Sequence, residues 1–411
     1  MSVQIFTLLT LVLAIFTGFK RKVNTGLVSM LLAFIVGVYV VGIPVRNVIA
    51  GFPTSLFLTL AGMTFLFAIA KVNGTLSLLA AKLAGLAGSN IKLLPIIFFI
   101  IPAMFSAIGP GPIVMTALMA PLAQSIAERE NIPPILMACM VVSGSLAGGL
   151  SPLCPSGIIA HNLSVEVGVS DYTPIFLCVM IASTIQGIFY YFFFGGLKLK
   201  GQERVAEKTA AFSSDQKTTL VLIAVAVIAI LVFKMDIGLT GFACGTILLL
   251  LYPRMQKEAI ANTAWDTLLL ISGVSVLIKV IATAGGIKTL IDFLSSIMTP
   301  SSSTAIMAAI AGLMSTVSSA SGVVMPTLIP TSAGIAQNMG TVSVSAIVAA
   351  IVVGAHAVTY SPFSTLGALS LAAAGEKTDK DKLFIQLITL EIGNVFYAAV
   401  LGLIGFYSIA G

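Results

Sequence analysis

The chain has 411 residues, of which 58% are hydrophobic and only 9% are charged, and its mean hydropathy is +1.10. Because soluble domains carry about 25% charged residues, this composition excludes a soluble enzyme or binding module and predicts an integral membrane protein. The net charge of +6 comes from short basic loops between apolar runs, so it does not predict nucleic acid as a partner. The four cysteines lie in apolar segments without metal-ligand spacing, and no bound metal or cofactor is expected.

Apolar runs of about 20 residues predict the membrane spans in chain order. They cover residues 3–19, 25–43, 54–70, 93–127, 134–163 and 172–197, then 218–234, 237–253, 264–283, 303–337, 343–374 and 383–410. The runs 93–127 and 303–337 are too long for one span and barely long enough for two. Both carry small residues and helix breakers at their middle, so we predict a re-entrant hairpin at each. The runs 134–163 and 343–374 are predicted to be single spans broken at residues 148–157 and 358–367.

The two halves of the chain repeat one pattern. Gly144, Ser151, Pro152 and Gly157 recur 210 residues later, at residues 354, 361, 362 and 367. Likewise, residues 26 and 62 match the glycines at 238 and 273. We therefore predict a first repeat over residues 1–197, a cytoplasmic linker over 198–217 and a second repeat over 218–411.

The placement of basic residues predicts the orientation. With the N-terminus outside, seventeen basic residues fall on the cytoplasmic side, and only Arg46, Lys234, Lys279 and Lys288 fall outside or near that face. Five spans plus one re-entrant hairpin give each repeat an odd number of crossings, so the second repeat must be inverted and both termini lie outside. The predicted fold is an all-α polytopic membrane protein with two inverted-topology repeats, each of five spans, one of them a broken helix, and one hairpin.

The hairpin tips and helix breaks are the candidate binding site. Irregular backbone at membrane depth must line a cavity or be buried in protein. Helix N-termini favour an anion, while carbonyls and hydroxyls suit Na⁺. We expect the substrate to bind Ser106, Gly111, Ser151, Pro152, Ser156, Ser319, Ser321, His356, Thr359, Ser361, Ser364 and Thr365. We expect sodium to bind Ser106, Gly109, Ser151, Ser315, Ser318, Ser319 and Thr359. For any single serine, the alternative that it only allows close helix packing stays open.

Few titratable groups lie inside the predicted spans. Glu391 and Lys279 are functional candidates, because a charged residue inside the membrane usually has a function. Two structural alternatives stay open: the two residues form a Lys–Glu pair, or the Lys279 side chain extends to the membrane interface. His356 lies inside the second broken segment and could bind a carboxylate, whereas His161 lies beyond the first break. No acid stands at the breaks, which favours Na⁺ over proton coupling. No basic residue marks the site, so anion binding would depend on helix dipoles. The nucleophile–base pairs expected of an enzyme are missing, so we predict that the chain is not an enzyme.

At the tips (106–112 and 315–322) and breaks (148–157 and 359–367), the chain resembles the ion transporter superfamily. The resemblance is to divalent anion–sodium symporters and related dicarboxylate or malonate carriers. In that family each tip has a Ser-Asn-Thr signature, and a broken helix with a Gly-Thr-Pro-like signature follows. This chain departs from it: Pro110 or Gly111 stands near the asparagine position of the first tip, and Ala320 in the second. The second tip keeps flanking hydroxyls at Ser319 and Ser321.

The resemblance implies a sodium-coupled carrier of a small organic anion such as a dicarboxylate. It also implies an elevator motion, a homodimer and the cytoplasmic (inner) membrane of a prokaryotic cell. Three alternatives stay open. The first is a proton-coupled antiporter or inorganic oxyanion exporter on the same scaffold, with Glu391, Lys279 and His356 as coupling groups. The others are a channel and a membrane scaffold or enzyme subunit without transport activity.

Overall fold

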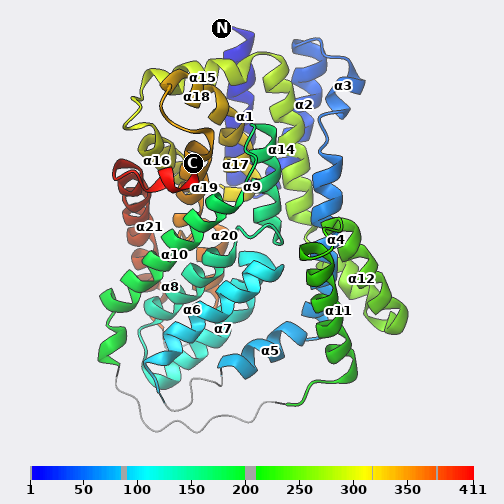
Figure 1. Ribbon diagram of the computed structural model, residues 1–411, viewed down its shortest axis with the longest axis vertical. Helices are drawn as coiled ribbons and strands as arrows, with labels where there is room; N and C mark the ends of the chain where they lie inside the picture. Colours follow the sequence, from blue (N-terminus) through cyan, green and yellow to red (C-terminus); the bar gives the residue numbers. More distant parts are fainter. Residues whose placement is uncertain (1, 85–89, 200–209, 317, 376–377) are drawn as a thin grey trace.

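The computed structural model describes residues 2–84, 90–199, 210–316, 318–375 and 378–411 (Figure 1). Within these residues the regular structure is helical and contains no strand. Six of the described helices are long and apolar enough to cross a membrane, and two bent helix pairs bring the number to as many as eight. The prediction of an all-α polytopic membrane protein is confirmed.

The helices of the first half follow the predicted runs. They are α1 (Val3–Arg21), α2 (Thr25–Phe34), α3 (Val45–Ile49), α4 (Thr54–Val72), α5 (Thr75–Ala84), α6 (Leu93–Ile108), α7 (Gly111–Glu130), α8 (Pro134–Gly148), α9 (Pro155–Glu166) and α10 (Thr173–Phe193). A π-helix over Ile35–Val40 extends α2. The short helices α3 and α5 lie outside the predicted runs.

The second half continues in the same way. Its helices are α11 (Ser214–Leu231), α12 (Ile237–Leu251), α13 (Gln256–Asn262), α14 (Trp265–Thr283), α15 (Gly286–Ser296), α16 (Ser303–Ser315), α17 (Met325–Leu328), α18 (Ser332–Met339), α19 (Val344–Ala357), α20 (Thr365–Ala372) and α21 (Lys380–Leu403). The short helices α13 and α15 lie outside the predicted runs. Of the predicted linker, residues 200–209 lie outside the described residues, and α11 begins within its last four positions.

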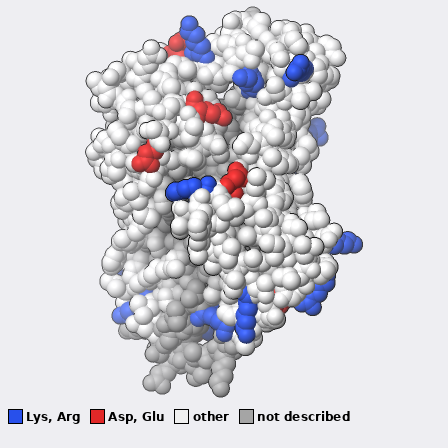
Figure 2. All heavy atoms as spheres, turned by 45° about the vertical axis from the view of Figure 1, so that its right-hand side comes forward, with Lys and Arg blue, Asp and Glu red and all other residues white. Residues whose placement is uncertain are grey.

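Matching helices of the two halves lie at opposite ends of the molecule. In Figure 1, α1 begins at the upper end and α11 at the lower end, while the short helices α5 and α15 lie at the lower and upper ends. Figure 2 shows that Lys and Arg predominate at the lower end of the face in view, whereas Asp and Glu appear mainly in its upper half. By the positive-inside rule, the lower end is the one expected to face the cytoplasm.

Both long apolar runs turn back at their middle. Only Gly109 and Pro110 separate α6 from α7, and these two helices lie side by side (Figure 1). The second run bends by 120° between α16 and the segment Ala320–Met339. That segment mixes a π-helix, Ala320–Val324, with α17, a 3₁₀ turn and α18. Val317, inside the predicted second tip, lies outside the described residues.

Both broken spans are interrupted where Gly, Pro and Ser accumulate. Between α8 and α9 the chain is irregular from Gly149 to Cys154, and Pro155 then occupies the first position of α9. A proline is tolerated there because that backbone nitrogen has no helical partner. Between α19 and α20 the irregular stretch covers residues 358–364. Each break lies within the predicted residues.

Two glycine pairs bring helices of the two halves into backbone contact. A Cβ atom on Gly62 of α4 would lie 1.9 Å from the carbonyl oxygen of Gly238 in α12. A Cβ atom on Gly273 of α14 would lie 1.9 Å from the carbonyl oxygen of Gly26 in α2. These are the glycines that match between the halves of the sequence. Each contact therefore joins one helix from each half, at equivalent positions.

The Gly273→Ala variant is expected to melt at a lower temperature than the wild type. The added methyl group would meet a backbone atom, which cannot rotate away, and overpacking of this kind costs about 1–3 kcal/mol. Gly393→Ala in α21 is the matched control, since nothing lies within 4 Å of a Cβ atom there. Thermal unfolding in detergent compares the two variants. Equal melting temperatures would show that the α2–α14 contact tolerates separation.

Candidate functional site

A small cavity, the central cavity, lies where both hairpin tips and both helix breaks meet. Its volume is about 40 Å³. Its lining residues are Pro112, Ile113, Leu146, Ser156, Ser318, Ser319, Ala320, Ser321, His356, Thr359, Ser364, Thr365 and Leu366. The structure thus brings together residues that lie more than 200 positions apart in the chain, and most of them are predicted site residues.

The first tip contributes backbone and apolar groups rather than hydroxyls. Gly109 and Gly111 have φ values of +150° and +76°, which residues with a side chain rarely adopt. A Cβ atom on Gly109 would also lie 1.9 Å from the ring of Phe67 in α4. Both glycines line a second space of about 100 Å³, the tip cavity, which shares Pro112, Ile113, Ser156 and Ser321 with the central cavity.

The second tip supplies three hydroxyl groups. The Ser318 hydroxyl donates to the Met314 carbonyl at 2.6 Å, and the Ser319 oxygen accepts the Gly322 N–H at 3.0 Å. Ser321 is 8% exposed, and its hydroxyl has no hydrogen-bond partner among the described residues. The Ser318 oxygen therefore keeps its lone pairs for a ligand, and Ser321 retains both a donor and acceptors.

Hydroxyl groups also stabilise the second break. The Ser364 hydroxyl lies 2.8 Å from the carbonyl oxygens of both Thr359 and Ser361, and the Thr359 hydroxyl donates to the His356 carbonyl at 3.0 Å. Because their protons point at carbonyl groups of the chain, the hydroxyl oxygens of Thr359 and Ser364, which both line the central cavity, keep lone pairs for a ligand. Clustered lone pairs of this kind suit a hard cation.

Glu391 of α21 binds the backbone of the second break. Its Oε2 accepts the backbone N–H of Ser361 at 2.9 Å, and its side chain is only 3% exposed. The other carboxylate oxygen is buried and has no partner in the described part of the chain. The alternative of a Lys279–Glu391 pair is therefore wrong. The loop geometry of the break presents an amide N–H to the carboxylate, whereas Lys279 lines a different cavity together with Glu166.

The first break is held by different groups. The Ser151 oxygen accepts the Leu153 N–H at 3.3 Å, and the Tyr172 hydroxyl donates to the Leu150 carbonyl at 3.1 Å. Ser156, in the first turn of α9, is 6% exposed and has no side-chain hydrogen bond among the described residues. It lines both the central and the tip cavity, so its hydroxyl is available to a ligand.

The two histidines have different surroundings. His356 lines the central cavity, and its Nδ1 lies 3.1 Å from the Val352 carbonyl, which can only accept. Nδ1 is therefore the donor, and a neutral ring leaves Nε2 as an acceptor. The ring of His161 instead packs against that of Tyr172, with 5.3 Å between the ring centroids, and His161 lines none of the cavities described in this section.

Five of the predicted site residues line none of these cavities: Ser106, Ser151, Pro152, Ser315 and Ser361. Ser106 and Ser315 occupy matching positions near the ends of α6 and α16. Both are completely buried, and neither hydroxyl has a hydrogen-bond partner in the described part of the chain. A buried hydroxyl without a partner is costly, so the recurrence of this feature in both halves calls for a ligand or a functional reason.

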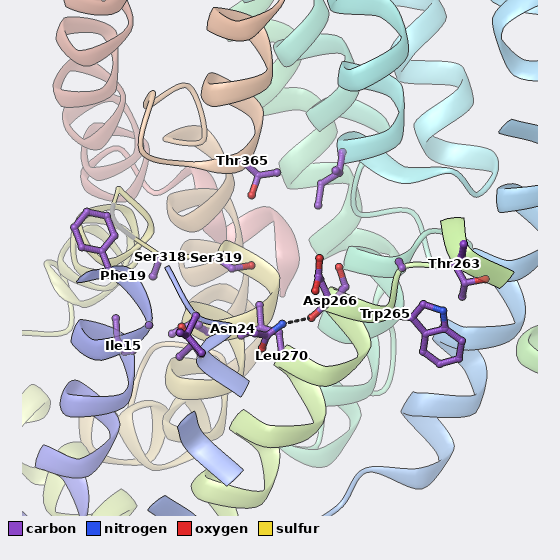
Figure 3. A pocket seen from close by; sticks show the side chains of 18 of the residues that line it. Ile15, Phe19, Asn24, Thr263, Trp265, Asp266, Leu270, Ser318, Ser319 and Thr365 are labelled. Carbon is purple, nitrogen blue, oxygen red and sulfur yellow. Dashed lines mark hydrogen bonds between the residues drawn. The ribbon is translucent and has the colours of Figure 1, made fainter. Parts of the chain in front are cut away.

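Two larger cavities lie at opposite ends of α4 and α14. The lower cavity has a volume of about 680 Å³ and includes Asn24, Lys71, Asp266, Ser318, Ser319 and Thr365 in its lining. Figure 3 shows Ser318, Ser319 and Thr365 on this cavity, with Asn24 hydrogen-bonded to Asp266. The upper cavity, of about 600 Å³, includes Pro53, Asn162, Glu166, Lys279, Pro326 and Pro330. The central cavity shares four lining residues with the lower cavity and none with the upper one.

Sequence reasoning misses the residues that α4, α2 and α14 contribute. In the sequence Lys71 counts only as a cytoplasmic charge, and nothing singles out Asn24, Trp265 or Asp266. These residues lie at span ends and give no sign of facing a cavity. The structure places all four on the lower cavity.

The fold is similar to that of a solved membrane transporter. A crystal structure of the Alcanivorax borkumensis YdaH transporter, described as having an unusual topology, matches with a TM-score of 0.62 and 15% sequence identity. The match covers 93% of this chain and 96% of that one. At this identity the likeness concerns the fold alone.

Residues 1–149 match the family model described as dicarboxylate carrier protein MatC N-terminus. The predicted resemblance to dicarboxylate or malonate carriers is thereby confirmed over this part of the chain. A comparison with curated proteins gives no significant match. Both matches are to carriers or transporters, so the prediction that the chain is a transporter and not an enzyme is confirmed.

Proposed function

We propose that this protein is a secondary active transporter of a small organic anion, a dicarboxylate, driven by sodium. The observation that carries the proposal is the meeting of both tips and both breaks at the central cavity. Such a site offers hydroxyl oxygens and helix ends at one place, which suits an anion together with a cation. The match of residues 1–149 to a dicarboxylate carrier model supports this substrate class.

The buried hydroxyls of Ser106 and Ser315 support sodium as the coupling ion. Each lies less than one turn before the end of its helix, and each lacks a partner among the described residues. A sodium ion coordinated by such a hydroxyl and by nearby tip and break oxygens would satisfy it. The second half is the richer in oxygen, because Ser318, Ser319 and Thr359 add hydroxyl groups where the matching positions of the first half are Gly109, Pro110 and Gly149.

Equivalent close contacts support two inverted repeats over residues 1–197 and 218–411. A Cβ atom on Gly144 would lie 2.1 Å from the Phe99 carbonyl oxygen, and one on Gly354 would lie 2.2 Å from that of Ala308. Each contact packs a broken helix on the first helix of its own hairpin. An elevator motion of these parts against α2, α4, α12 and α14, and a homodimer, are further parts of the proposal that rest on the resemblance.

Uptake of labelled malonate and succinate into proteoliposomes tests the proposal. We expect uptake only with an inward Na⁺ gradient, and competition between the two dicarboxylates. A K⁺ gradient of equal size is the control for the membrane potential and ionic strength. Folded protein that takes up neither anion with Na⁺ would contradict the proposal.

The Ser315→Ala variant is expected to need a higher Na⁺ concentration for half-maximal uptake, by about 2- to 10-fold, because one oxygen ligand is lost. The fold should be unaffected, since the hydroxyl makes no hydrogen bond to the described residues. Ser296→Ala on the exposed face of α15 is the control. An unchanged Na⁺ dependence in Ser315→Ala would exclude this serine as a ligand.

Proton coupling is the second candidate, and one observation favours it. Glu391 is a buried acid that contacts the second break directly, through the Ser361 N–H. Loss and gain of a proton on Glu391 would change the strength of the hydrogen bond that joins α21 to the second break. Under this alternative, uptake would follow a proton gradient without Na⁺.

A further inference from the structure

Lys71 lies in the last turn of α4 and lines both the lower cavity and the tip cavity. It is the only charged residue among the described residues that line the tip cavity. Asp266 lines the lower cavity but not the tip cavity. The tip cavity therefore has a single positive charge and no acid in its described lining.

The charge of Lys71 is not neutralised by an acid in the described part of the chain. Its Nζ donates one hydrogen bond, of 3.2 Å, to the side-chain oxygen of Asn262. Asn262 is neutral, and an ammonium group has three donors. Two donors of Lys71 thus remain for a ligand.

Two buried hydroxyls face the same space. Ser156 and Ser321 are 6% and 8% exposed, line the tip cavity and have no side-chain partner among the described residues. The N-terminal ends of α7 and α9, at Gly111 and Pro155, also border the cavity and favour negative charge. A carboxylate only accepts hydrogen bonds, so it can pair with the Lys71 ammonium group and with the two serine hydroxyls.

We propose that the tip cavity is a carboxylate subsite in which Lys71 supplies the positive charge. This inference rests on the proposed function and names the group that recognises the anion, in place of helix dipoles alone. The tip cavity and the central cavity share Pro112, Ile113, Ser156 and Ser321. A dicarboxylate can therefore place one carboxylate beside Lys71 and the other in the central cavity, which a monocarboxylate cannot do.

Ligand-induced stabilisation in detergent tests the subsite without requiring transport. The melting temperature of the protein is measured against malonate concentration at saturating Na⁺, with acetate as the monocarboxylate probe. Lys71→Gln keeps a donor for Asn262 and should weaken malonate binding about ten-fold, while Lys71→Arg should retain most of it. Lys279→Gln is the matched control, because Lys279 lines the upper cavity and not the site.

The outcomes separate the subsite from the proposed function. Stabilisation by malonate that is weakened in Lys71→Gln but not in Lys279→Gln supports the subsite. Equal malonate affinity in Lys71→Gln and the wild type would overturn it and leave the proposed function standing. If neither malonate nor succinate stabilises the folded wild-type protein, the proposed function fails, and the subsite fails with it.

Discussion

Uptake by the Ser321→Leu variant is expected to fall to background while the protein stays folded. Ser321 lies at the second tip and lines both the central and the tip cavity. A leucine side chain would project into space that is hollow in the structure, so it would exclude the substrate without forcing the helices apart. Ser321→Ala, which only removes the hydroxyl, should reduce uptake by about 2- to 10-fold.

Uptake in proteoliposomes and melting temperature in detergent measure the two parts of this prediction. Ser296→Leu is the matched control, because Ser296 is exposed near the end of α15 and lies away from all the cavities described. It should keep both uptake and stability. Wild-type uptake by a well-expressed Ser321→Leu protein would remove the central cavity from the transport path.

The Glu391→Ala variant is expected to lose at least about nine-tenths of its uptake and to melt at a lower temperature. It would leave the buried Ser361 N–H without its acceptor, at a cost of about 1–3 kcal/mol. The second break would then no longer be held to α21. Glu391→Gln keeps an acceptor oxygen of the same reach, so it should retain much of the uptake under sodium coupling.

This pair of variants also separates the two candidate functions. Under proton coupling, Glu391→Gln should abolish gradient-driven uptake as completely as Glu391→Ala, because neither can take up a proton. Under sodium coupling, only Glu391→Ala should fail. Thr389→Ala, on the exposed face of the same helix, is the control and should match the wild type. Normal uptake by Glu391→Ala would show that the break does not depend on the carboxylate.

The irregular parts of the fold could be predicted because they are rich in glycine and proline, which favour turns and helix ends. Gly109 and Gly111 adopt positive φ values, and Pro110 and Pro155 occupy positions where a helix begins or ends. Several such residues standing together mark a break in an apolar run, whereas the single prolines Pro102 and Pro121 lie inside α6 and α7. The helices α5 and α15 were missed because each has fewer than 12 residues and does not form an apolar run long enough to span a membrane.

The direction of each side chain could not be predicted. Ser361 and Ser364 lie in the same break, yet only Ser364 lines the central cavity. The Ser361 N–H donates to Glu391, and the Ser361 hydroxyl oxygen accepts the Phe363 N–H at 3.1 Å. Lys71 lies at the end of a helix. Whether such a residue is exposed on a loop or lines a cavity depends on segments that are far away in the chain. The sequence identified Glu391 as an intramembrane acid but not its amide partner.

The glycine contacts have a consequence for biosynthesis. Because α2 packs on α14 and α4 packs on α12, each of these four helices has its glycine partner in the other half of the chain. When α4 leaves the ribosome, α12 and α14 have not yet been translated, and at about 5–20 residues per second the wait is roughly ten to forty seconds. During this interval the first half depends on lipid or on the insertion machinery to cover its glycine faces. The protein therefore reaches its final form only after the second half has been inserted, as an assembly of two interlocked parts of one chain.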